Sequence, residues 1–220
     1  MDVVVDRHES GAKALCAGLQ QLGLAPALVS PLMAYRDLLV RWNRVYNLSA
    51  VRDPEAMIAK HLLDSLAVLP WLPSGRLIDV GTGPGLPGIP IALAEPDRWV
   101  SLLESNGKKV RFLRQVCLEL SLNNVEVIDS RLADYTPSQR FDVAICRAFS
   151  EAASFCQGVR HLLTPGGWAL AMKGRVQAQE LAGLEQAGVS CRWQPLVVPG
   201  LDAERHLLMM TGGVPAAGSN

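Results

Sequence analysis

The residues best suited to chemistry lie in one stretch, 77–88, which reads Leu-Ile-Asp-Val-Gly-Thr-Gly-Pro-Gly-Leu-Pro-Gly. A hydrophobic run (76–80) leads into glycines at positions 81, 83, 85 and 88, and an apolar run (89–94) follows. Glycine tolerates positive φ and lets a ligand approach the backbone closely. A strand, a glycine-rich loop and a helix in this order are typical of the first βα unit of a nucleotide-binding sheet. The stretch predicts a nucleotide-derived ligand; the competing interpretation is a glycine-rich turn without one.

The residues around the glycines favour one class of ligand. The glycine spacing fits both GxGxG and GxGxxG, so spacing alone does not decide. A pyrophosphate needs several N–H donors at a helix start, but Pro84 and Pro87 remove two of them, and Asp79 would repel a phosphate. S-adenosylmethionine (SAM) carries no phosphate. Its cationic groups suit Asp79, and its carboxylate suits the N–H groups of Gly81 and Gly83. The stretch therefore favours SAM over NAD.

Two further groups are placed to contact such a ligand. Glu104 ends the strand predicted over 98–104, and an acidic residue about 20 residues beyond a glycine loop typically binds a ribose diol. Leu132 and Ala133 follow the strand predicted over 124–129, where they could flank an adenine. Asp134 fits this loop site and a helix or turn cap equally well.

Arg147 ends the strand predicted over 141–147. An arginine at the end of a buried strand is costly unless it is paired. The position favours contact with cofactor or substrate; a structural pair with an acid such as Asp142 is the alternative.

A group of basic residues follows Glu104 on the helix predicted over 106–120, at Lys108, Lys109, Arg111 and Arg114. Lysines near a helix N-terminus oppose the helix dipole, which indicates an outside partner for their charge. Lys173 ends the strand predicted over 167–173 on the same rim. We interpret this strip as a contact for an RNA backbone; a solvated helix face is the alternative.

His61, Asp64 and Ser65 share one face of a predicted helix, at spacings i, i+3 and i+4. They are too close in sequence for a hydrolase triad, and no nucleophile elbow is present. A hydrogen-bonded cluster that joins the N-terminal helices to the sheet is favoured. The role of His206 is left open.

The surrounding pattern predicts an α/β fold with a helical N-terminal extension. Helices are predicted over 8–22, from Ser30-Pro31 to about residue 46, and over 54–69 with a possible break. From residue 76, seven strands (76–80, 98–104, 124–129, 141–147, 167–173, 191–198, 205–211) alternate with helices over 86–94, 106–120, 150–162 and 176–187. This alternation indicates a mostly parallel sheet covered on both faces. Pro199 and Gly200 form a hairpin-like connection, so the last strand should be antiparallel. We expect an extension over 1–75, a sheet domain over 76–212 and a loose tail over 213–220.

Charge, cysteine spacing and the hydrophobic segments limit the class of protein to which the chain can belong. The formal net charge is zero, so nucleic-acid contact has to come from a local patch. The five cysteines are scattered, with no zinc or CxxC spacing, and indicate reduced thiols in a cytoplasmic protein without a metal. The N-terminus does not resemble a signal peptide, and no stretch suits a membrane span.

Several motifs remain that span most of the chain. They are 42–48 (Trp-Asn-Arg-Val-Tyr-Asn-Leu), 51–54, 61–65 (His-Leu-Leu-Asp-Ser), 78–90, 109–115, 130–131, 147–149, 173–174 and 204–206 (Glu-Arg-His). The block 79–88 with both prolines is the most specific of them. In this order, the motifs resemble one known family, that of the bacterial small-subunit ribosomal RNA guanine-N7 methyltransferase RsmG, also called glucose-inhibited division protein B.

The resemblance implies a Rossmann-like, SAM-dependent methyltransferase fold and methyl transfer to N7 of one guanine, at position 527, of 16S rRNA in the small ribosomal subunit. By position, Gly81, Leu86, Leu132, Ala133 and Arg147 match the family's cofactor contacts. Ala133 stands where relatives often carry an acid, which leaves a backbone contact there. Glu104 replaces an aspartate and keeps the carboxylate.

The implied chemistry needs no general base, because guanine N7 has a free lone pair and bears no proton. We therefore name no acid–base residue; Arg147 is a candidate for positioning the substrate. The expected product is S-adenosylhomocysteine (SAH), and we expect a monomer. The candidate RNA contacts are Arg44, Arg52, Lys108, Lys109, Arg111, Arg114, Arg131 and Lys173. The alternatives are a NAD-dependent oxidoreductase and a non-catalytic module that binds SAM or RNA.

Overall fold

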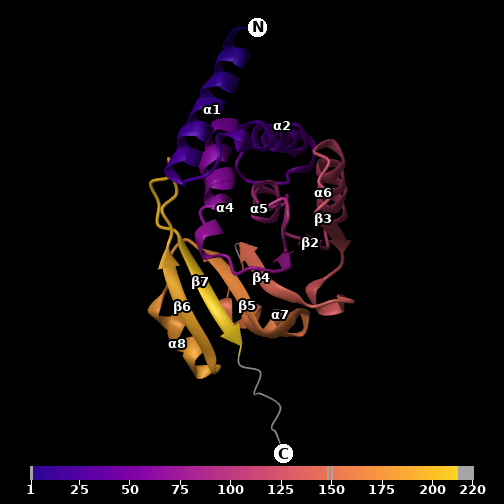
Figure 1. The fold of residues 1–220 in the computed structure, drawn as a ribbon, viewed down its shortest axis with the longest axis vertical. Helices are drawn as coiled ribbons and strands as arrows, with labels where there is room; N and C mark the ends of the chain where they lie inside the picture. The colour runs from indigo at the N-terminus through magenta and orange to yellow at the C-terminus, as the bar shows by residue number, and fades with distance from the viewer. Residues whose placement is uncertain (1, 148, 150, 213–220) are drawn as a thin grey trace, which may run out of the picture.

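A seven-stranded sheet forms the centre of the fold, with strand order β3-β2-β1-β4-β5-β7-β6 (Figure 1). The computed structural model describes residues 2–147, 149 and 151–212. The predicted tail over 213–220 and Ala148 of the 147–149 motif lie outside the described residues. The strands are β1 (Leu77–Val80), β2 (Val100–Glu104), β3 (Val125–Asp129), β4 (Phe141–Arg147), β5 (Leu163–Lys173), β6 (Val189–Pro195) and β7 (His206–Gly212).

Strands β1 to β5 pair in parallel, whereas β7 is antiparallel to both β5 and β6. The prediction of a mostly parallel sheet with an antiparallel last strand is confirmed. The order reverses between β1 and β4, which are neighbours in the sheet. Ligands of open α/β sheets bind beside the carboxyl ends of the strands at such a reversal, so the glycine loop after β1 lies in the expected place.

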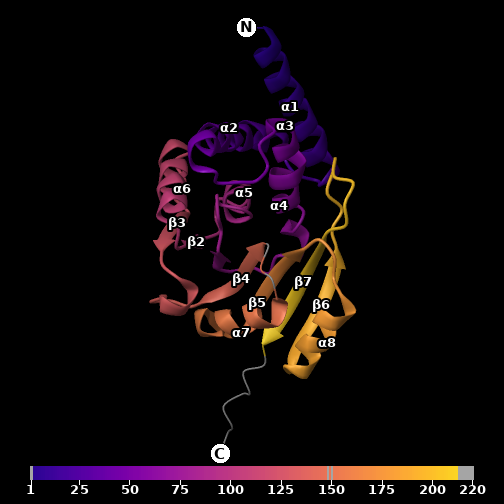
Figure 2. The same ribbon diagram turned by 180° about the vertical axis from the view of Figure 1, so that it is seen from behind.

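Helices cover the sheet on both faces (Figures 1 and 2). One hydrophobic cluster joins the N-terminal helices, α5 and α6 to one face, and a second joins α7 and α8 to the other. The helices are α1 (Asp2–Gln21), η1 (Pro26–Leu28), α2 (Val29–Tyr46), α3 (Pro54–Met57), η2 (Ile58–Leu63), α4 (Asp64–Leu66), η3 (Leu69–Trp71), α5 (Gly88–Ala94), α6 (Gly107–Glu119), η4 (Leu132–Asp134), α7 (Ala152–Val159), η5 (Arg160–Leu162) and α8 (Ala178–Gln186).

The N-terminal helices differ in detail from the sequence prediction. Helix α2 begins at Val29, directly after η1, so Ser30 lies inside the helix and does not cap it. The segment 54–66 starts at Asp53, whose carboxylate accepts hydrogen bonds from Glu55 N and Ala56 N. The predicted break is a π-helical turn, η2, which contains His61.

The division at residue 75 stays a prediction, and the hydrophobic core runs across it. Leu15, Leu32 and Leu39 of the N-terminal helices belong to the same buried cluster as Leu86 and Ile89 after β1. The N-terminal helices are therefore part of what holds the glycine loop in place. Within the described ranges, none of the helices has both the length and the hydrophobicity that crossing a bilayer requires.

Candidate active site at the carboxyl edge of the sheet

Asp79 organises the glycine loop from the end of β1. Its side chain is fully buried, and its Oδ2 accepts hydrogen bonds from Thr82 Oγ1 (2.6 Å) and from the backbone N of Gly88 (2.8 Å). Its Oδ1 makes no hydrogen bond with any residue that the structure describes. Burial raises the pKa of Asp79 to about 6, although the bonds from Thr82 and Gly88 favour the charged form. One oxygen thus holds the loop, and the other is an acceptor without a protein donor.

The loop leaves bare backbone at two positions. Gly81 and Gly83 have positive φ angles of 65° and 64°, a conformation that residues with a Cβ rarely adopt. A Cβ built on Gly81 would meet no atom within 4 Å, and one on Gly83 would only approach Lys109 Nζ and Gly81 O, at 3.9 and 4.0 Å. The space beside these glycines is therefore open to a ligand.

Glu104 holds the loop from the neighbouring strand. Its Oε2 accepts a hydrogen bond from Gly83 N (2.9 Å), and its Oε1 accepts from Ser105 N and Asn106 N, both at 2.9 Å. The side chain is buried, and Lys109 Nζ lies 3.8 Å from Oε2. Each carboxylate oxygen has two lone pairs, so Glu104 keeps acceptor capacity for a hydroxyl.

Tyr35 of α2 fixes the loop from the N-terminal side. Its hydroxyl donates a 2.8 Å hydrogen bond to the carbonyl oxygen of Pro84, and its side chain is fully buried. Burial raises the pKa of Tyr35 far above its ordinary value, so the hydroxyl stays a donor. The sequence showed Tyr35 only as one residue of an apolar helix face, and no local signal connects it to a loop 49 residues away.

Arg147 at the end of β4 lies in a charged cluster with Asp64. Its Nη1 donates to Lys60 O (3.1 Å) and lies 3.4 Å from Asp64 Oδ2, while Arg205 Nε donates to Asp64 Oδ1 at 3.0 Å. Burial raises the pKa of Asp64 even though both guanidinium groups act to lower it. The acid beside Arg147 is therefore Asp64; Asp142 instead accepts hydrogen bonds from Arg76 N and Thr164 Oγ1.

His61 belongs to a neighbouring network. Burial, followed by the charge of Arg147, lowers the pKa of His61 to about 4, so the ring is neutral at pH 7. Its Nδ1 lies 2.9 Å from Lys60 O and its Nε2 lies 2.8 Å from Ser49 Oγ, which fits donation by Nδ1 and acceptance by Nε2. Of the three residues that the sequence grouped, only Asp64 joins the N-terminal helices to the sheet, because His61 bonds within the N-terminal segment and Ser65 Oγ makes no hydrogen bond with any residue that the structure describes.

The remaining candidate residues are spread along the same edge. Leu132 and Ala133 form η4 after β3, where Leu132 is half-buried and Ala133 is exposed. His206, whose role the sequence left open, lies with Nδ1 2.9 Å from the carbonyl oxygen of Gly174. Across the described part of the chain, no cluster of three or more His, Cys, Asp or Glu is arranged to bind a metal ion.

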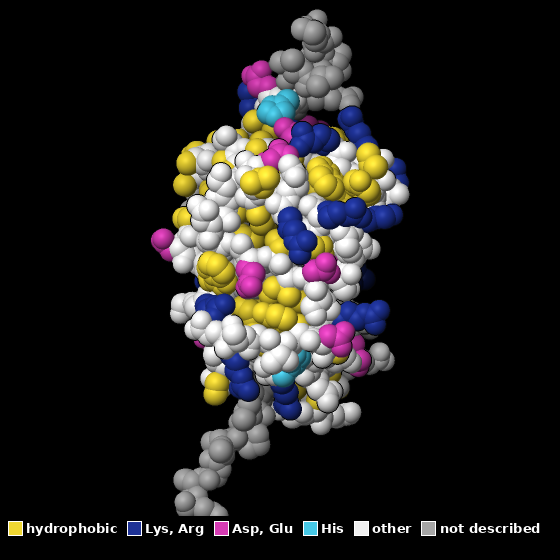
Figure 3. Space-filling model, turned by 90° about the vertical axis from the view of Figure 1, so that its right-hand side faces the viewer, with side chains coloured by type: hydrophobic (Ala, Val, Ile, Leu, Met, Phe, Trp, Pro, Cys, Tyr) yellow, Lys and Arg dark blue, Asp and Glu magenta, His cyan; other side chains and the backbone are white. Residues whose placement is uncertain are grey.

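The candidate RNA contacts differ in exposure. Figure 3 shows lysine and arginine side chains spread over the face that carries α6. The exposed candidates are Arg44, Arg52, Lys108, Arg111, Arg114 and Arg131. Lys109 is half-buried beside Glu104, and Lys173 is only 11% exposed, with its Nζ 2.7 Å from Glu180 Oε1. These two lysines are therefore engaged in ion pairs at the edge of the sheet.

The sequence profile of one family, described as rRNA small subunit methyltransferase G, matches residues 29–208 of this chain. The chain belongs to this family. The ribosomal RNA small subunit methyltransferase G of Alkalilimnicola ehrlichii is 48% identical over 206 residues, covering 93% of this chain and 94% of that protein. The Chromobacterium violaceum protein of the same name is 50% identical over 196 residues, covering 88% and 94%.

Solved structures confirm the methyltransferase fold. The glycopeptide N-methyltransferase MtfA, solved with SAM, superposes with a TM-score of 0.58 at 13% identity and covers 69% of this chain and 86% of its own. A SAM-dependent methyltransferase from Aquifex aeolicus gives a TM-score of 0.56 at 20% identity, covering 74% and 96%. At such identities the likeness concerns the fold alone.

Membership of the methyltransferase G family decides between the two ligand classes that the glycine spacing left open. The protein is a SAM-dependent rRNA methyltransferase, and the NAD-dependent alternative is dropped. The residues present fit this cofactor. The open backbone at Gly81 and Gly83 leaves room for it, and the unpartnered Oδ1 of Asp79 is an acceptor for a cationic group.

Proposed function

We propose that this protein transfers the methyl group of SAM to N7 of the guanine at position 527 of 16S rRNA, within the assembled small subunit. The observation that carries the proposal is the glycine loop of Asp79, open at Gly81 and Gly83, in a chain of the methyltransferase G family. Membership supports the rRNA substrate, and the base and the atom follow from the resemblance of the motifs.

When bound, SAM supplies a sulfonium methyl group. The lone pair of guanine N7 forms the new N–C bond as the C–S bond breaks; SAH leaves as a neutral thioether and the positive charge moves to the guanine ring. No proton is transferred, so the enzyme mainly has to hold the nucleophile in line with the C–S bond. This accounts for a site whose buried His61 is tied to Ser49 and Lys60 and does not serve as a base.

We propose that residues at the ends of several strands contact different parts of the cofactor. Asp79 Oδ1 accepts from the ammonium group, the methionine end of the ligand lies against the open backbone of Gly81 and Gly83, and Glu104 accepts from the ribose hydroxyls. The N–H groups of these two glycines donate to Leu103 O and Glu104 Oε2 within the protein, so they do not bind the carboxylate as the sequence suggested. Leu86 and η4, with Leu132 and the backbone of Ala133, flank the adenosine. Arg147 lies at the boundary between cofactor and substrate. We further propose that the enzyme acts as a monomer and without a metal ion.

Methyl transfer from labelled SAM to small subunits that lack the modification tests the proposal directly. We expect label in 16S rRNA, and mapping of the modified base should place it at N7 of guanine 527. Label on another base, or none with subunits that a known methyltransferase can modify, would refute the assignment. Labelling of naked 16S rRNA at an equal rate would refute the requirement for an assembled subunit.

The buried carboxyl of Asp79 predicts a pH dependence of cofactor binding. Its raised pKa of about 6 means that it is ionised at pH 7 and becomes neutral as the pH falls. A neutral carboxyl attracts a cation less, so the Kd for SAH should rise by up to about tenfold per pH unit below the pKa. Calorimetric titration at pH 7, 6 and 5 measures this.

The control for the pH effect is an Asp79→Asn variant, which should bind SAH weakly with a Kd that is flat over the same range. Asp97→Asn, which changes an exposed carboxylate at the surface, should keep the wild-type profile. An unchanged wild-type Kd from pH 7 to pH 5 would contradict the role given to Asp79.

Charge reversal on α6 tests the RNA interface. Arg111 and Arg114 are exposed, whereas Lys109 pairs with Glu104 beside the loop and is a poor choice for this purpose. Arg111→Glu should raise KM for subunits several-fold. It should also lower the slope of log affinity against log salt concentration by about one, the contribution of one phosphate contact. Its Kd for SAH should not change.

Lys13→Glu is the matched control, because it makes the same charge change at an exposed position of α1. Subunit methylation assays at two salt concentrations compare the two variants. Equal effects of Arg111→Glu and Lys13→Glu would show that net charge alone, and not α6, sets the affinity for the subunit.

A further inference from the structure

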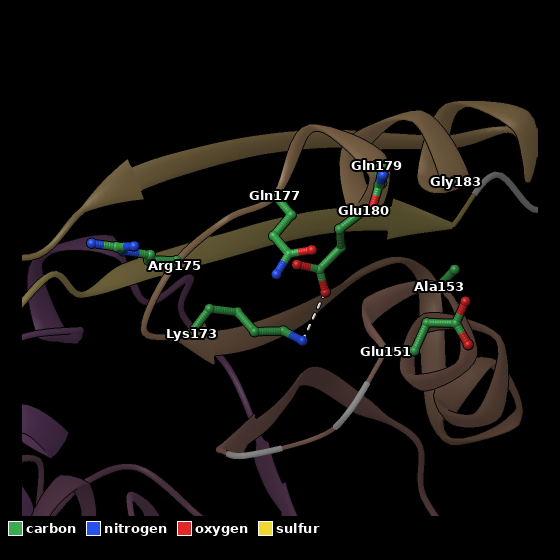
Figure 4. A pocket seen from close by; sticks show the side chains of 8 residues that line it. All are labelled: Glu151, Ala153, Lys173, Arg175, Gln177, Gln179, Glu180 and Gly183. Atoms are coloured by element: carbon green, nitrogen blue, oxygen red, sulfur yellow. Dashed lines mark ion pairs between the residues drawn. The ribbon is translucent and has the colours of Figure 1, made fainter.

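A polar cavity of about 350 Å³ lies next to the carboxyl end of β5, outside the glycine loop (Figure 4). It is bounded by the end of β5, the start of α7, and α8 with the segment that leads into it. Its lining includes Glu151, Lys173, Gln177 and Glu180. No cofactor contact proposed above lies in it.

Glu180 is the anchored acceptor of this cavity. Its Oε1 is held by Lys173 Nζ (2.7 Å) and by the backbone N of Ala152 (3.3 Å), and its side chain is 15% exposed. Its Oε2 makes no hydrogen bond with the residues that the structure describes, and it is not sealed from the cavity. A carboxylate fixed through one oxygen can present the other to a donor on a ligand.

The cavity borders the strand end at which substrates are expected. Arg147 of β4 pairs in register with Met172, so Lys173 lies one residue beyond it on the neighbouring strand. Lys173 Nζ also donates to Phe149 O at 2.9 Å, so it contacts a residue that lies two positions after Arg147 in the sequence. A group bound by Glu180 would therefore lie beside the end of β4, within the edge that carries the glycine loop.

We propose that this cavity receives the Watson–Crick edge of the target guanine, with Glu180 accepting from the base and Gln177 donating to it. The inference rests on the proposed function, since it assumes that the base is guanine and that N7 is the methylated atom. The inference adds the residues that select guanine over the other bases.

The donor pattern of guanine fits these side chains. Guanine presents N1–H and the N2 amino group as neighbouring donors, beside the O6 acceptor. Glu180 can accept from the two donors, and the amide of exposed Gln177, which Figure 4 shows extending toward Glu180, can donate to O6. Adenine and cytosine place an unprotonated ring nitrogen where guanine has N1–H, so a carboxylate would repel them. Recognition through this edge leaves N7 free.

The same contact assists the reaction electrostatically. Methylation puts a positive charge on the guanine ring, and this charge extends to the N1–H and N2 donors. A carboxylate that accepts from them binds the charged transition state more strongly than the neutral ground state, which raises kcat as well as affinity. Lys173 pairs with Oε1 at 2.7 Å, so Oε2 is the oxygen that would accept from the base.

The test compares three variants in methylation of unmodified small subunits, with SAH affinity and thermal unfolding measured alongside. Glu180→Gln should lower kcat/KM about ten- to hundredfold, with part of the loss in kcat, because it removes a charged hydrogen-bond acceptor. Gln177→Ala should lower it about fivefold. Glu185→Gln, on the exposed end of the same helix, should match wild type. The Kd for SAH should change less than twofold in all three.

The outcomes separate this inference from the proposed function. If wild-type enzyme labels guanine N7 but Glu180→Gln has wild-type kcat/KM, the inference is overturned and the function stands. Loss of SAH affinity parallel to the loss of activity would also overturn it, because the pair would then be structural. If Glu180→Gln does not fold, Gln177→Ala decides, and normal turnover of that variant refutes the inference. No labelling by the wild type is a failure of the proposed function itself.

Discussion

A Gly88→Ala variant should lose SAH binding and about 3 kcal/mol of stability. A Cβ at this position would lie 2.3 Å from Leu102 Cδ2 and 2.9 Å from Asp79 Oδ2. Leu102 is fully buried in β2, so it cannot move aside without disturbing the core. The shift would also break the 2.8 Å hydrogen bond from Gly88 N to Asp79 that ties the start of α5 to β1. Chemical denaturation and calorimetric titration with SAH measure the two losses.

Gly107→Ala is the matched control, because Gly107 is the first residue of α6 as Gly88 is of α5. A Cβ on Gly107 would meet no atom within 4 Å. Its substitution should leave SAH affinity unchanged and should stabilise the protein slightly, by up to about 1 kcal/mol, through the unfolded state. Wild-type stability and affinity in Gly88→Ala would show that the contact between α5 and β2 is not tight.

An Asp64→Ala variant should lose about 3 kcal/mol of stability and most of its methyltransferase activity. Asp64 is 4% exposed and lies between Arg147 and Arg205. Removal of the carboxylate leaves both guanidinium groups, 22% and 27% exposed, without their anion. It also removes the side-chain link between α4 and the end of β4, so that only the hydrogen bond from Arg147 to Lys60 O still ties β4 to η2. Because the arginines are partly solvated, the loss should lie toward the lower end of the range for buried pairs.

Asp64→Asn refines this prediction, since the amide can keep one hydrogen bond but not the charge. It should fall between wild type and Asp64→Ala in unfolding free energy. Asp202→Ala, at an exposed position in the same connection as Arg205, should behave as wild type. If Asp64→Ala unfolds like wild type, the two arginines are satisfied by water and the cluster does not join the N-terminal helices to the sheet.

Much of the fold could be predicted because its signals are local. In the apolar runs of β1 to β5 and in the amphipathic segments between them, the spacing of hydrophobic residues within each segment indicates a strand or a helix. The start of α2 was misplaced, because a short 3₁₀ turn at Pro26 runs directly into the helix and makes a cap at Ser30 unnecessary. The π-helical turn was visible only as a possible break, since a wide turn has no distinct sequence period.

The candidate site likewise combines residues that the sequence could place with residues that it could not. Asp79, the glycines and Glu104 lie next to strand ends in sequence, so their position on one edge followed from the topology of a parallel sheet. The hydrogen-bond partners of Tyr35, Asp64 and Arg205 could not be assigned, because Tyr35 bonds to Pro84 and Asp64 bonds to Arg147 and Arg205, all distant in sequence. Lys173 was interpreted as an RNA contact, and only the packing of α8 shows that its charge is shared with Glu180.

The sequence by itself determined the ligand class and the place of the loop, because glycines, prolines and Asp79 act through backbone chemistry that needs only neighbouring residues. The tertiary structure decided which charges are available to a ligand. Whether a carboxylate or an ammonium group is free, paired or buried depends on what distant segments bring beside it, and the free energy of a charge depends on that environment more than on its own residue type. Asp79 keeps one buried oxygen without a protein donor because Thr82 and Gly88 bond to the other, and Asp64 is occupied because two arginines converge on it.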